Sequence, residues 1–162
     1  DKAMLELLYA TGIRVSELIG LDITDVNLSM GYIRCSNSKG ERLIPVGNKA
    51  VDALMLYLEK ARNSMIKDAN ETALFINRLG ARISRQGFWK IIKHYQESSG
   101  IDTEITPHSL RHSFAAHLIQ NGADLQSLKS MMGHSDISTT QIYAKLNQNK
   151  RRDVYSKAHP RG

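Results

Sequence analysis

Apolar residues recur at helical spacing along most of this chain, and that spacing limits it to a mainly α-helical fold. Met4, Leu5, Leu7 and Leu8 share one face of an expected helix over residues 2–11. The glycine that follows is expected to end this helix. The N-terminal part of the chain is therefore predicted to pack through an amphipathic helix.

Residues with capping side chains mark the expected starts of further helices. They are Ser16, Asn48, Ser84, Thr106 and Asp124. The proline after Thr106 suits a first helical turn, and Gly122 is placed to end that helix. The amphipathic stretch after Asn48 predicts a helix to about residue 63, and a last short helix is expected to carry Tyr143.

Two β-prone runs interrupt the helical pattern. Residues 32–35 and 43–46 flank a polar segment that contains Lys39, an arrangement typical of a β-hairpin with the lysine at or beside its turn. Residues 73–76 are a further candidate strand. We expect a mainly α fold with a small antiparallel β-sheet, of the α+β class, in one domain.

Composition narrows the classes of partner. The 162 residues carry 22 Lys and Arg against 16 Asp and Glu, a net charge of +6 that favours polyanions. No apolar run approaches the roughly 20 residues of a membrane span. Cys35 is the single cysteine, which excludes an intrachain disulfide and a Cys-rich zinc module. With no secretory leader at its start, the chain is expected in the cytoplasm.

Three local patterns could carry chemistry. His108 and Arg111 stand at i and i+3 inside the first turns of a helix, which suits an anion, although a capping histidine and a surface cation explain them too. Arg14 precedes Glu17 by three residues, so the carboxylate could hold the guanidinium or form a simple surface ion pair. Tyr143 is either a reactive phenol or a core aromatic.

A zinc site on the same helix is a weaker alternative. His108 and His112 stand at i and i+4, a spacing that can share a metal, and His117 lies further along. However, no Cys, Asp or Glu at ligand spacing completes the site, and Arg111 would repel a cation. We therefore expect no metal, with His112 and His117 in structural roles.

Three ordered motifs give these residues a common context. They are Thr-Gly-Ile-Arg-Val-Ser-Glu-Leu, His-Ser-Leu-Arg-His-Ser-Phe-Ala-Ala-His-Leu and Met-Gly-His-Ser-Asp-Ile-Ser-Thr-Thr-Gln-Ile-Tyr. Together they closely resemble the tyrosine recombinase (phage integrase) family. The resemblance spans almost the whole chain, and the final His-Pro-Arg-Gly looks like the end of its Xer-type members.

The resemblance implies a catalytic set of six residues: Arg14, Lys39, His108, Arg111, His134 and Tyr143. It implies that the two arginines bind the non-bridging oxygens of a scissile phosphate, which the bidentate guanidinium suits and lysine does not. Tyr143 would be the nucleophile, and its phenol, with a reference pKa near 10, needs a base and cationic surroundings.

The remaining roles follow from the same resemblance. His108 would transfer protons, His134 would bind the phosphate and position the nucleophile, and Lys39 would protonate the departing 5′ oxygen. Glu17 would support Arg14. Recombination by this route forms a 3′-phosphotyrosyl intermediate and requires neither a metal nor another cofactor.

The implied partners are a double-stranded DNA site and further recombinase protomers. The DNA-contacting residues are expected to be Arg42, Arg82, Arg85, Gln86 and Lys93, although solvated charge explains each of them equally well. Residues 1–146 would form the catalytic domain, and the tail over 147–162 would be exchanged between protomers in a homo- or hetero-tetramer. The family's N-terminal DNA-binding domain is expected to be absent from the chain.

The cellular task would be chromosome dimer resolution, or integration and excision of a mobile element. Two rival functions remain open: a type IB topoisomerase-like nicking and closing enzyme, and a helix-turn-helix DNA-binding module without catalysis. Tyr155, a second phenol in the tail, is an alternative nucleophile to Tyr143.

Overall fold

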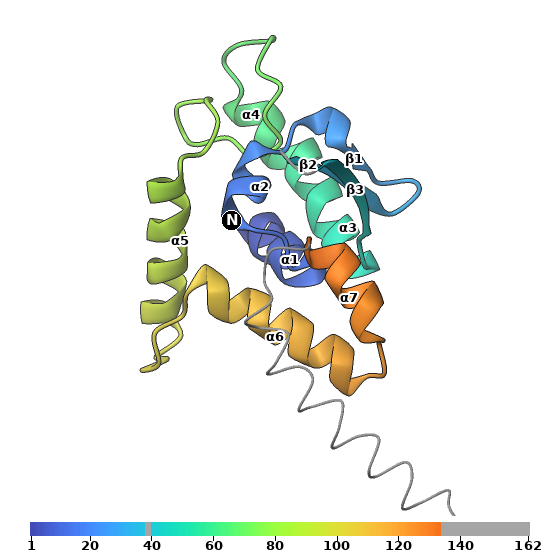
Figure 1. Cartoon of the computed structure of the whole chain (residues 1–162). Helices are drawn as coiled ribbons and strands as arrows, with labels where there is room; N and C mark the ends of the chain where they lie inside the picture. Colours follow the sequence, from blue (N-terminus) through green and yellow to red (C-terminus); the bar gives the residue numbers. More distant parts are fainter. Residues whose placement is uncertain (38–39, 134–162) are drawn as a thin grey trace, which may run out of the picture.

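The computed structural model describes residues 1–37 and 40–133 and contains mostly helices with one small sheet (Figure 1). The three strands form an antiparallel sheet in the order β1-β2-β3. This architecture confirms the predicted class, mainly α with a small antiparallel β-sheet. None of the helices in the described ranges has the length and apolar character needed to cross a bilayer.

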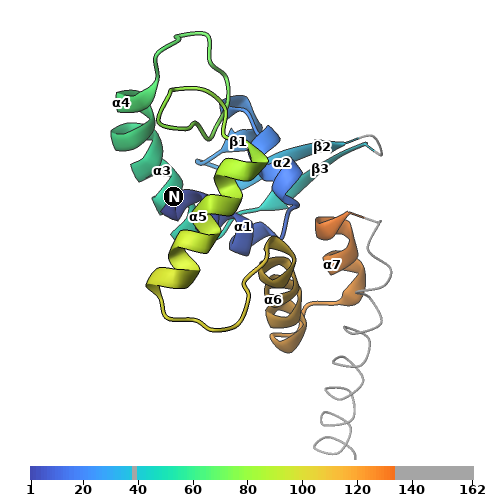
Figure 2. The same ribbon diagram turned by 90° about the vertical axis from the view of Figure 1, so that its left-hand side faces the viewer.

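Helix α1 (Lys2–Thr11) lies at the centre of the fold, packed against α3 (Asn48–Leu56) and α6 (Pro107–Gln120) (Figures 1 and 2). Its apolar stripe was predicted correctly, since Leu7 and Leu8 are fully buried. Gly12 ends the helix in the left-handed conformation with φ 59°, and its N–H donates to the Leu8 carbonyl at 2.9 Å.

The short helix α2 (Val15–Gly20) follows at once, and its start differs from the prediction. Its N-cap is Arg14 rather than Ser16, because the side chain of Glu17 reaches back and accepts the Arg14 N–H at 2.8 Å. The Glu17 carboxylate thus accepts the N–H of the N-cap residue itself, which fixes the start of the helix at Arg14 instead of Ser16. A 3₁₀ turn, η1 (Ile23–Asp25), leads into the sheet.

The predicted hairpin is confirmed by β2 (Tyr32–Asn37) and β3 (Gly40–Pro45), and β1 (Val26–Asn27) adds a strand that was not predicted. Ile33 and Ile44 are paired across β2 and β3 and are fully buried, whereas the next pair, Arg34 and Leu43, is exposed. This alternation directs one face of the hairpin into the core and leaves the other outside.

The candidate strand over residues 73–76 was wrong. Its residues make isolated bridges, Ala73 with Asp22 and Ile76 with Arg82, and join no sheet. Two side chains hold the segment instead: the Arg62 guanidinium donates to the Ala73 carbonyl at 3.0 Å, and the Tyr57 hydroxyl accepts the Ile76 N–H at 3.1 Å. Single backbone hydrogen bonds, from the Leu74 N–H to the Leu21 carbonyl and from the Ile83 N–H to the Phe75 carbonyl, complete the pairing of the segment without forming a strand.

The amphipathic helix after Gly47 is longer and less regular than predicted. It begins one residue early, with Gly47 rather than Asn48 as N-cap, and runs as α3, the π-helical turn η2 (Tyr57–Arg62) and α4 (Asn63–Met65). The π turn brings Tyr57 and Arg62 to the same side, where both bind the segment described above.

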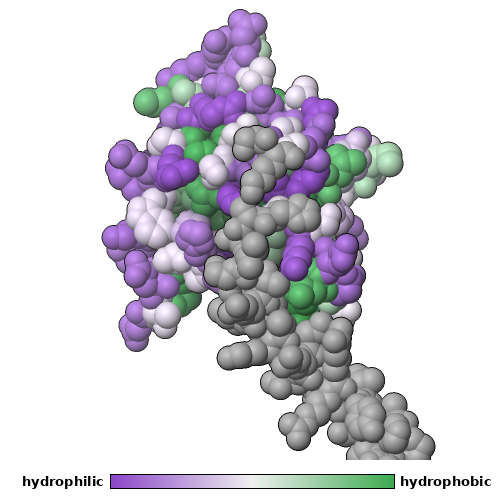
Figure 3. Space-filling model, in the orientation of Figure 1, coloured by the Kyte–Doolittle hydropathy of each residue, from purple (hydrophilic) through white to green (hydrophobic). Residues whose placement is uncertain are grey.

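The last three described helices start at the predicted caps. The side chains of Ser84, Thr106 and Asp124 accept N–H groups at the starts of α5 (Arg85–Ser98), α6 and α7 (Leu125–Met132). Helices α6 and α7 share a small apolar cluster of their own, which includes Phe114, Ile119 and Leu128. Figure 3 shows a mostly hydrophilic face with separate hydrophobic areas.

Candidate active site

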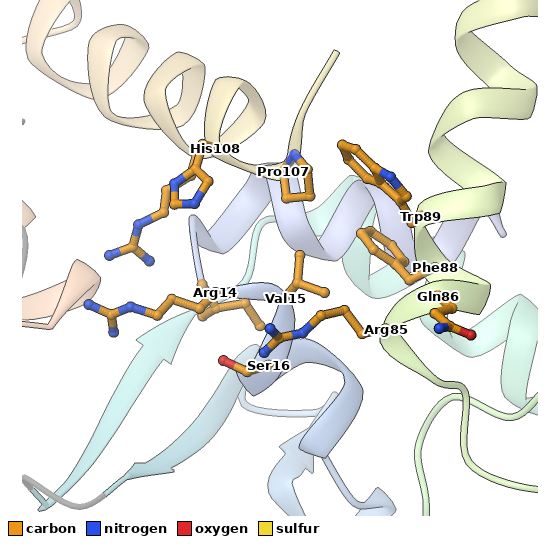
Figure 4. A pocket seen from close by; sticks show the side chains of 11 residues that line it. Arg14, Val15, Ser16, Arg85, Gln86, Phe88, Trp89, Pro107 and His108 are labelled. Carbon is orange, nitrogen blue, oxygen red and sulfur yellow. The ribbon is translucent and has the colours of Figure 1, made fainter. Parts of the chain in front are cut away.

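A pocket of about 510 Å³ lies where α2, α5 and α6 converge. The start of α2 contributes its N-cap Arg14 with Val15 and Ser16, and the N-terminal turns of α5 contribute Arg85, Gln86 and Trp89. Helix α6 contributes Pro107, His108 and Arg111. Figure 4 shows Arg14 and His108 reaching to one side of this space, while Arg85 extends from α5 toward Ser16. Three arginines and a histidine therefore surround one solvent-open pocket.

Arg14 and Arg111 are brought together by the close packing of α1 on α6. Arg111 lies one turn into α6 and is 5% exposed, and its guanidinium donates to the Gly12 carbonyl and to the Met132 carbonyl, the latter at 2.6 Å. Arg14 follows two residues after Gly12, with its side chain 31% exposed. Arg14 and Arg111 thus line the same pocket, and their role at a phosphate stays a prediction.

His108 lies on the first turn of α6, exposed, and lines the same pocket as Arg111 three residues later. The Thr106 hydroxyl and Pro107 fix this turn, because the hydroxyl accepts the Ser109 N–H at 3.0 Å. The free N–H groups of a helix N-terminus favour a nearby anion. His108 therefore lines the same pocket as the two arginines.

Glu17 does contact Arg14, as predicted, but its main partner is Arg42. The two side chains form a bidentate ion pair with N–O distances of 2.8 and 2.9 Å, against 3.7 Å from Glu17 to the Arg14 guanidinium. Burial raises the pKa of Glu17, but hydrogen bonds from Arg42 and from the Arg14 N–H, with the charges of both arginines, hold it below its ordinary value.

The predicted DNA-contacting residues separate into two groups. Arg85 and Gln86 are exposed and line the pocket, and Lys93 is exposed further along α5. Arg42 and Arg82 are instead engaged within the protein: Arg42 with Glu17, and Arg82 with Asp22 and with the Ile19 and Leu21 carbonyls. Contact of these two residues with DNA phosphate stays a prediction.

Part of the predicted site lies outside the described residues, namely Lys39, His134 and Tyr143, together with the alternative nucleophile Tyr155. Within residues 1–37 and 40–133, no group of three or more His, Cys, Asp or Glu side chains could hold a metal ion. His117 instead meets the Tyr9 hydroxyl, 2.5 Å from its Nδ1, a contact between α6 and α1.

Sequence reasoning did not identify the apolar side of the pocket. Val15, Phe88, Trp89 and Pro107 form it, and Trp89 lies beside Pro107 (Figure 4). A tryptophan one turn after Arg85, on the same face of α5, was the available signal. The pocket therefore joins a cationic side to an apolar one, which suits an anion with a bulky organic portion.

Fold and site together define a domain of mainly α architecture with a cationic pocket. Residues 1–150 match the phage integrase family, and the chain belongs to that family. Tyrosine recombinase XerD of Halalkalibacterium halodurans is 52% identical over 162 residues, 99% of this chain and 54% of the relative. Tyrosine recombinase XerD of Listeria innocua is 50% identical over 164 residues, 99% of this chain and 55% of the relative. The chain thus spans about half the length of these relatives.

Solved structures confirm the fold. The XerA recombinase structure superposes with a TM-score of 0.79 at 32% identity, covering 99% of this chain and 63% of that one. The catalytic domain of bacteriophage HP1 integrase superposes with a TM-score of 0.64 at 23% identity, covering 98% of this chain and 81% of that one. The described helices and sheet are therefore those of a tyrosine recombinase catalytic domain.

Proposed function

We propose that this chain is the catalytic domain of a site-specific DNA recombinase, which cleaves a strand by forming a 3′-phosphotyrosyl bond through Tyr143 and later rejoins it. The observation that carries the proposal is the convergence of Arg14, His108 and Arg111 on one pocket. Membership of the phage integrase family supports it.

The pocket suits phosphoryl transfer because negative charge builds on the non-bridging oxygens of the phosphate during attack. The guanidiniums of Arg14 and Arg111 are placed to offset that charge, an effect commonly worth 10²–10³ in rate for each lost donor. As the bond from phosphorus to Tyr143 forms, the bond to the 5′ oxygen breaks. The phenol loses its proton to a base, for which we propose His108, and the 5′ oxygen gains one, for which we propose Lys39.

The reverse step uses the same groups. A 5′ hydroxyl attacks the phosphotyrosine, Tyr143 leaves as the phenol, and the strand is rejoined without an outside energy source, because the intermediate keeps the phosphodiester energy. We assign His134 to phosphate binding and nucleophile positioning. These roles of Lys39, His134 and Tyr143 rest on the motifs in the sequence.

The proposed substrate is a double-stranded recombination site, with chromosome dimer resolution or mobile-element integration and excision as the task. Two solved structures with the same fold, XerH bound to a palindromic difH substrate after cleavage and to difH before it, support DNA as the substrate class. We also propose that residues 147–162 link protomers in a tetramer, for which the resemblance of the tail is the support.

A nicked suicide substrate tests the proposal, because loss of a short strand after cleavage traps the covalent intermediate. The substrates are duplexes built on difH and a second pool with randomised arms. The wild-type chain is expected to give a protein–DNA adduct resistant to denaturation, and Arg14→Gln is expected to slow its formation about 100-fold or more. DNA binding without any adduct would favour a non-catalytic module. Relaxation of supercoiled plasmid regardless of sequence would favour a topoisomerase.

A further inference from the structure

Arg42 is held by three hydrogen bonds that join separate parts of the site. From β3, its two terminal nitrogens donate to Glu17 on α2 at 2.8 and 2.9 Å, and its Nε donates to the Met131 carbonyl on α7 at 2.8 Å. The side chain is 13% exposed and that of Glu17 is 7% exposed. A guanidinium with fixed fork geometry can make this set of bonds, whereas an ammonium cannot.

On the α2 side, Arg42 acts on Arg14 through Glu17. The same carboxylate that binds Arg42 accepts the backbone N–H of Arg14 at 2.8 Å and lies 3.7 Å from its guanidinium. Removal of Arg42 would leave a buried carboxylate without its main counter-charge. The backbone position of Arg14, from which its side chain extends, therefore depends on the Arg42–Glu17 pair.

On the α7 side, two arginines bind the end of the helix. Arg42 binds the Met131 carbonyl, and Arg111 binds the next one, that of Met132. Carbonyls at a helix C-terminus have no partner within the helix and carry partial negative charge, so both contacts are favourable. Gly133 follows with φ 77°, and a Cβ there would lie 3.5 Å from Cζ of Arg42 and 3.6 Å from Nη1 of Arg14. The residue after Gly133 is His134.

We propose that Arg42 is a positioning residue for strand cleavage: by binding Glu17 and the end of α7 together, it sets Arg14 and the backbone that leads to His134 in one arrangement. The inference rests on the proposed recombinase function. It is supported by the three hydrogen bonds that Nε and the two terminal nitrogens of Arg42 donate within the protein.

The test compares adduct formation on suicide DNA for Arg42→Gln, Arg42→Lys and Glu17→Gln in the full chain. Arg34→Gln is the matched control, because it removes the same charge from the neighbouring strand β2. The Arg34 side chain is 44% exposed and forms ion pairs with Asp25 and Glu41. Cleavage rate at saturating DNA is measured separately from the dissociation constant for DNA.

Both Arg42 variants are expected to cleave about 100-fold more slowly at saturating DNA, the order of loss that a misplacement of about 1 Å produces. Their DNA affinity should stay within about twofold of wild type, and Arg42→Lys should not restore the rate although it keeps the charge. Glu17→Gln should show the same defect, and its combination with Arg42→Gln should be no slower than either single change.

Three results would overturn the proposal. They are a wild-type rate at saturating DNA for Arg42→Gln, full rescue by Arg42→Lys, and a defect confined to DNA affinity. If Arg42→Gln does not fold, Arg42→Lys and Glu17→Gln carry the same comparison.

Hydrogen exchange separates failure of this inference from failure of the proposed function. Amides in the last turn of α7 are expected to exchange faster in Arg42→Gln than in wild type and to be unchanged in Arg34→Gln, whether or not the chain cleaves DNA. If the wild-type chain forms no adduct but the variants show these differences in exchange, the recombinase function alone is refuted. Unchanged exchange in a chain that does cleave refutes the role of Arg42.

Discussion

The ring of Phe114 fills the space where a side chain at Gly12 would stand. A Cβ at Gly12 would come within 2.6 Å of Cε1 of that ring, and φ at Gly12 is 59°. The Gly12 carbonyl accepts a hydrogen bond from Arg111. These two contacts between the end of α1 and α6 therefore help to set how closely Arg14 and Arg111 approach the same pocket.

Gly12→Ala is expected to destabilise the protein. Overpacking of a close contact costs about 1–3 kcal/mol, and the left-handed backbone adds roughly 1 kcal/mol for a residue with a Cβ. Urea unfolding measures the change. Gly20→Ala is the control, because a Cβ there meets nothing within 4 Å, and it should be neutral or slightly stabilising. Equal stability of the two variants would show that Gly12 has room to adjust.

Substitutions of the two pocket arginines are expected to separate stability from chemistry. Arg111→Gln removes buried bonds to two carbonyls and should lower the free energy of unfolding by about 3 kcal/mol. Arg14→Gln removes a partly exposed ion pair and should cost under about 1 kcal/mol. Both should abolish most adduct formation. A pair of variants with the same unfolding midpoint in urea would contradict the different burial of the two side chains.

The Glu17 carboxylate is expected to make the free energy of unfolding depend on pH in the acidic range. Its pKa in the folded protein lies below the ordinary 4.5 because Arg42 and Arg14 outweigh the effect of burial. The unfolded state therefore binds a proton first as the pH falls. The stabilisation is complete above about pH 5 and declines as the pH falls below 4.5 toward the folded pKa. Unfolding of wild type and Glu17→Gln should consequently differ less at pH 3 than at pH 7; a constant difference would contradict the lowered pKa.

DNA binding by this chain is expected to be weak and sensitive to salt, because about half the length of its relatives is not represented in it. Arg85→Gln and Lys93→Gln should each weaken binding and reduce the slope of log affinity against log salt by about 1. Lys49→Gln, an exposed lysine on α3 outside the pocket, is the control. Fluorescence anisotropy across a salt series measures the slope, and nanomolar binding at physiological salt would refute the expectation.

The fold was predictable where local signals decide it. Thr106-Pro107 and Asp124 started helices as expected, and the alternation around Ile33 and Ile44 gave the hairpin. The failures lie where tertiary contacts override local preference. Residues 73–76 have the composition of a strand, but side chains of Tyr57 and Arg62 and single backbone groups from other segments bind their backbone. No local sequence pattern predicts hydrogen bonds between segments of this kind.

In the site, too, local motifs were informative and tertiary contacts could not be predicted. Arg14, His108 and Arg111 were predicted from motifs, since each motif places a functional residue at a fixed point of a helix start. The hydrogen bonds between Arg42 and Glu17 were not predicted, because the two residues are 25 positions apart in the chain. From the sequence, an arginine in a polar hairpin is expected to be exposed. In the structure the Arg42 side chain is only 13% exposed, because it packs against the buried carboxylate of Glu17.

The most direct test of the account is to map the residue that becomes covalently attached to suicide DNA. Proteolysis and mass spectrometry of the trapped adduct should place the phosphate on Tyr143. Tyr155→Phe should still form the adduct, and Tyr143→Phe should form none. An adduct on Tyr155, or one that persists in Tyr143→Phe, would contradict the assignment of the nucleophile and with it the arrangement of the whole site.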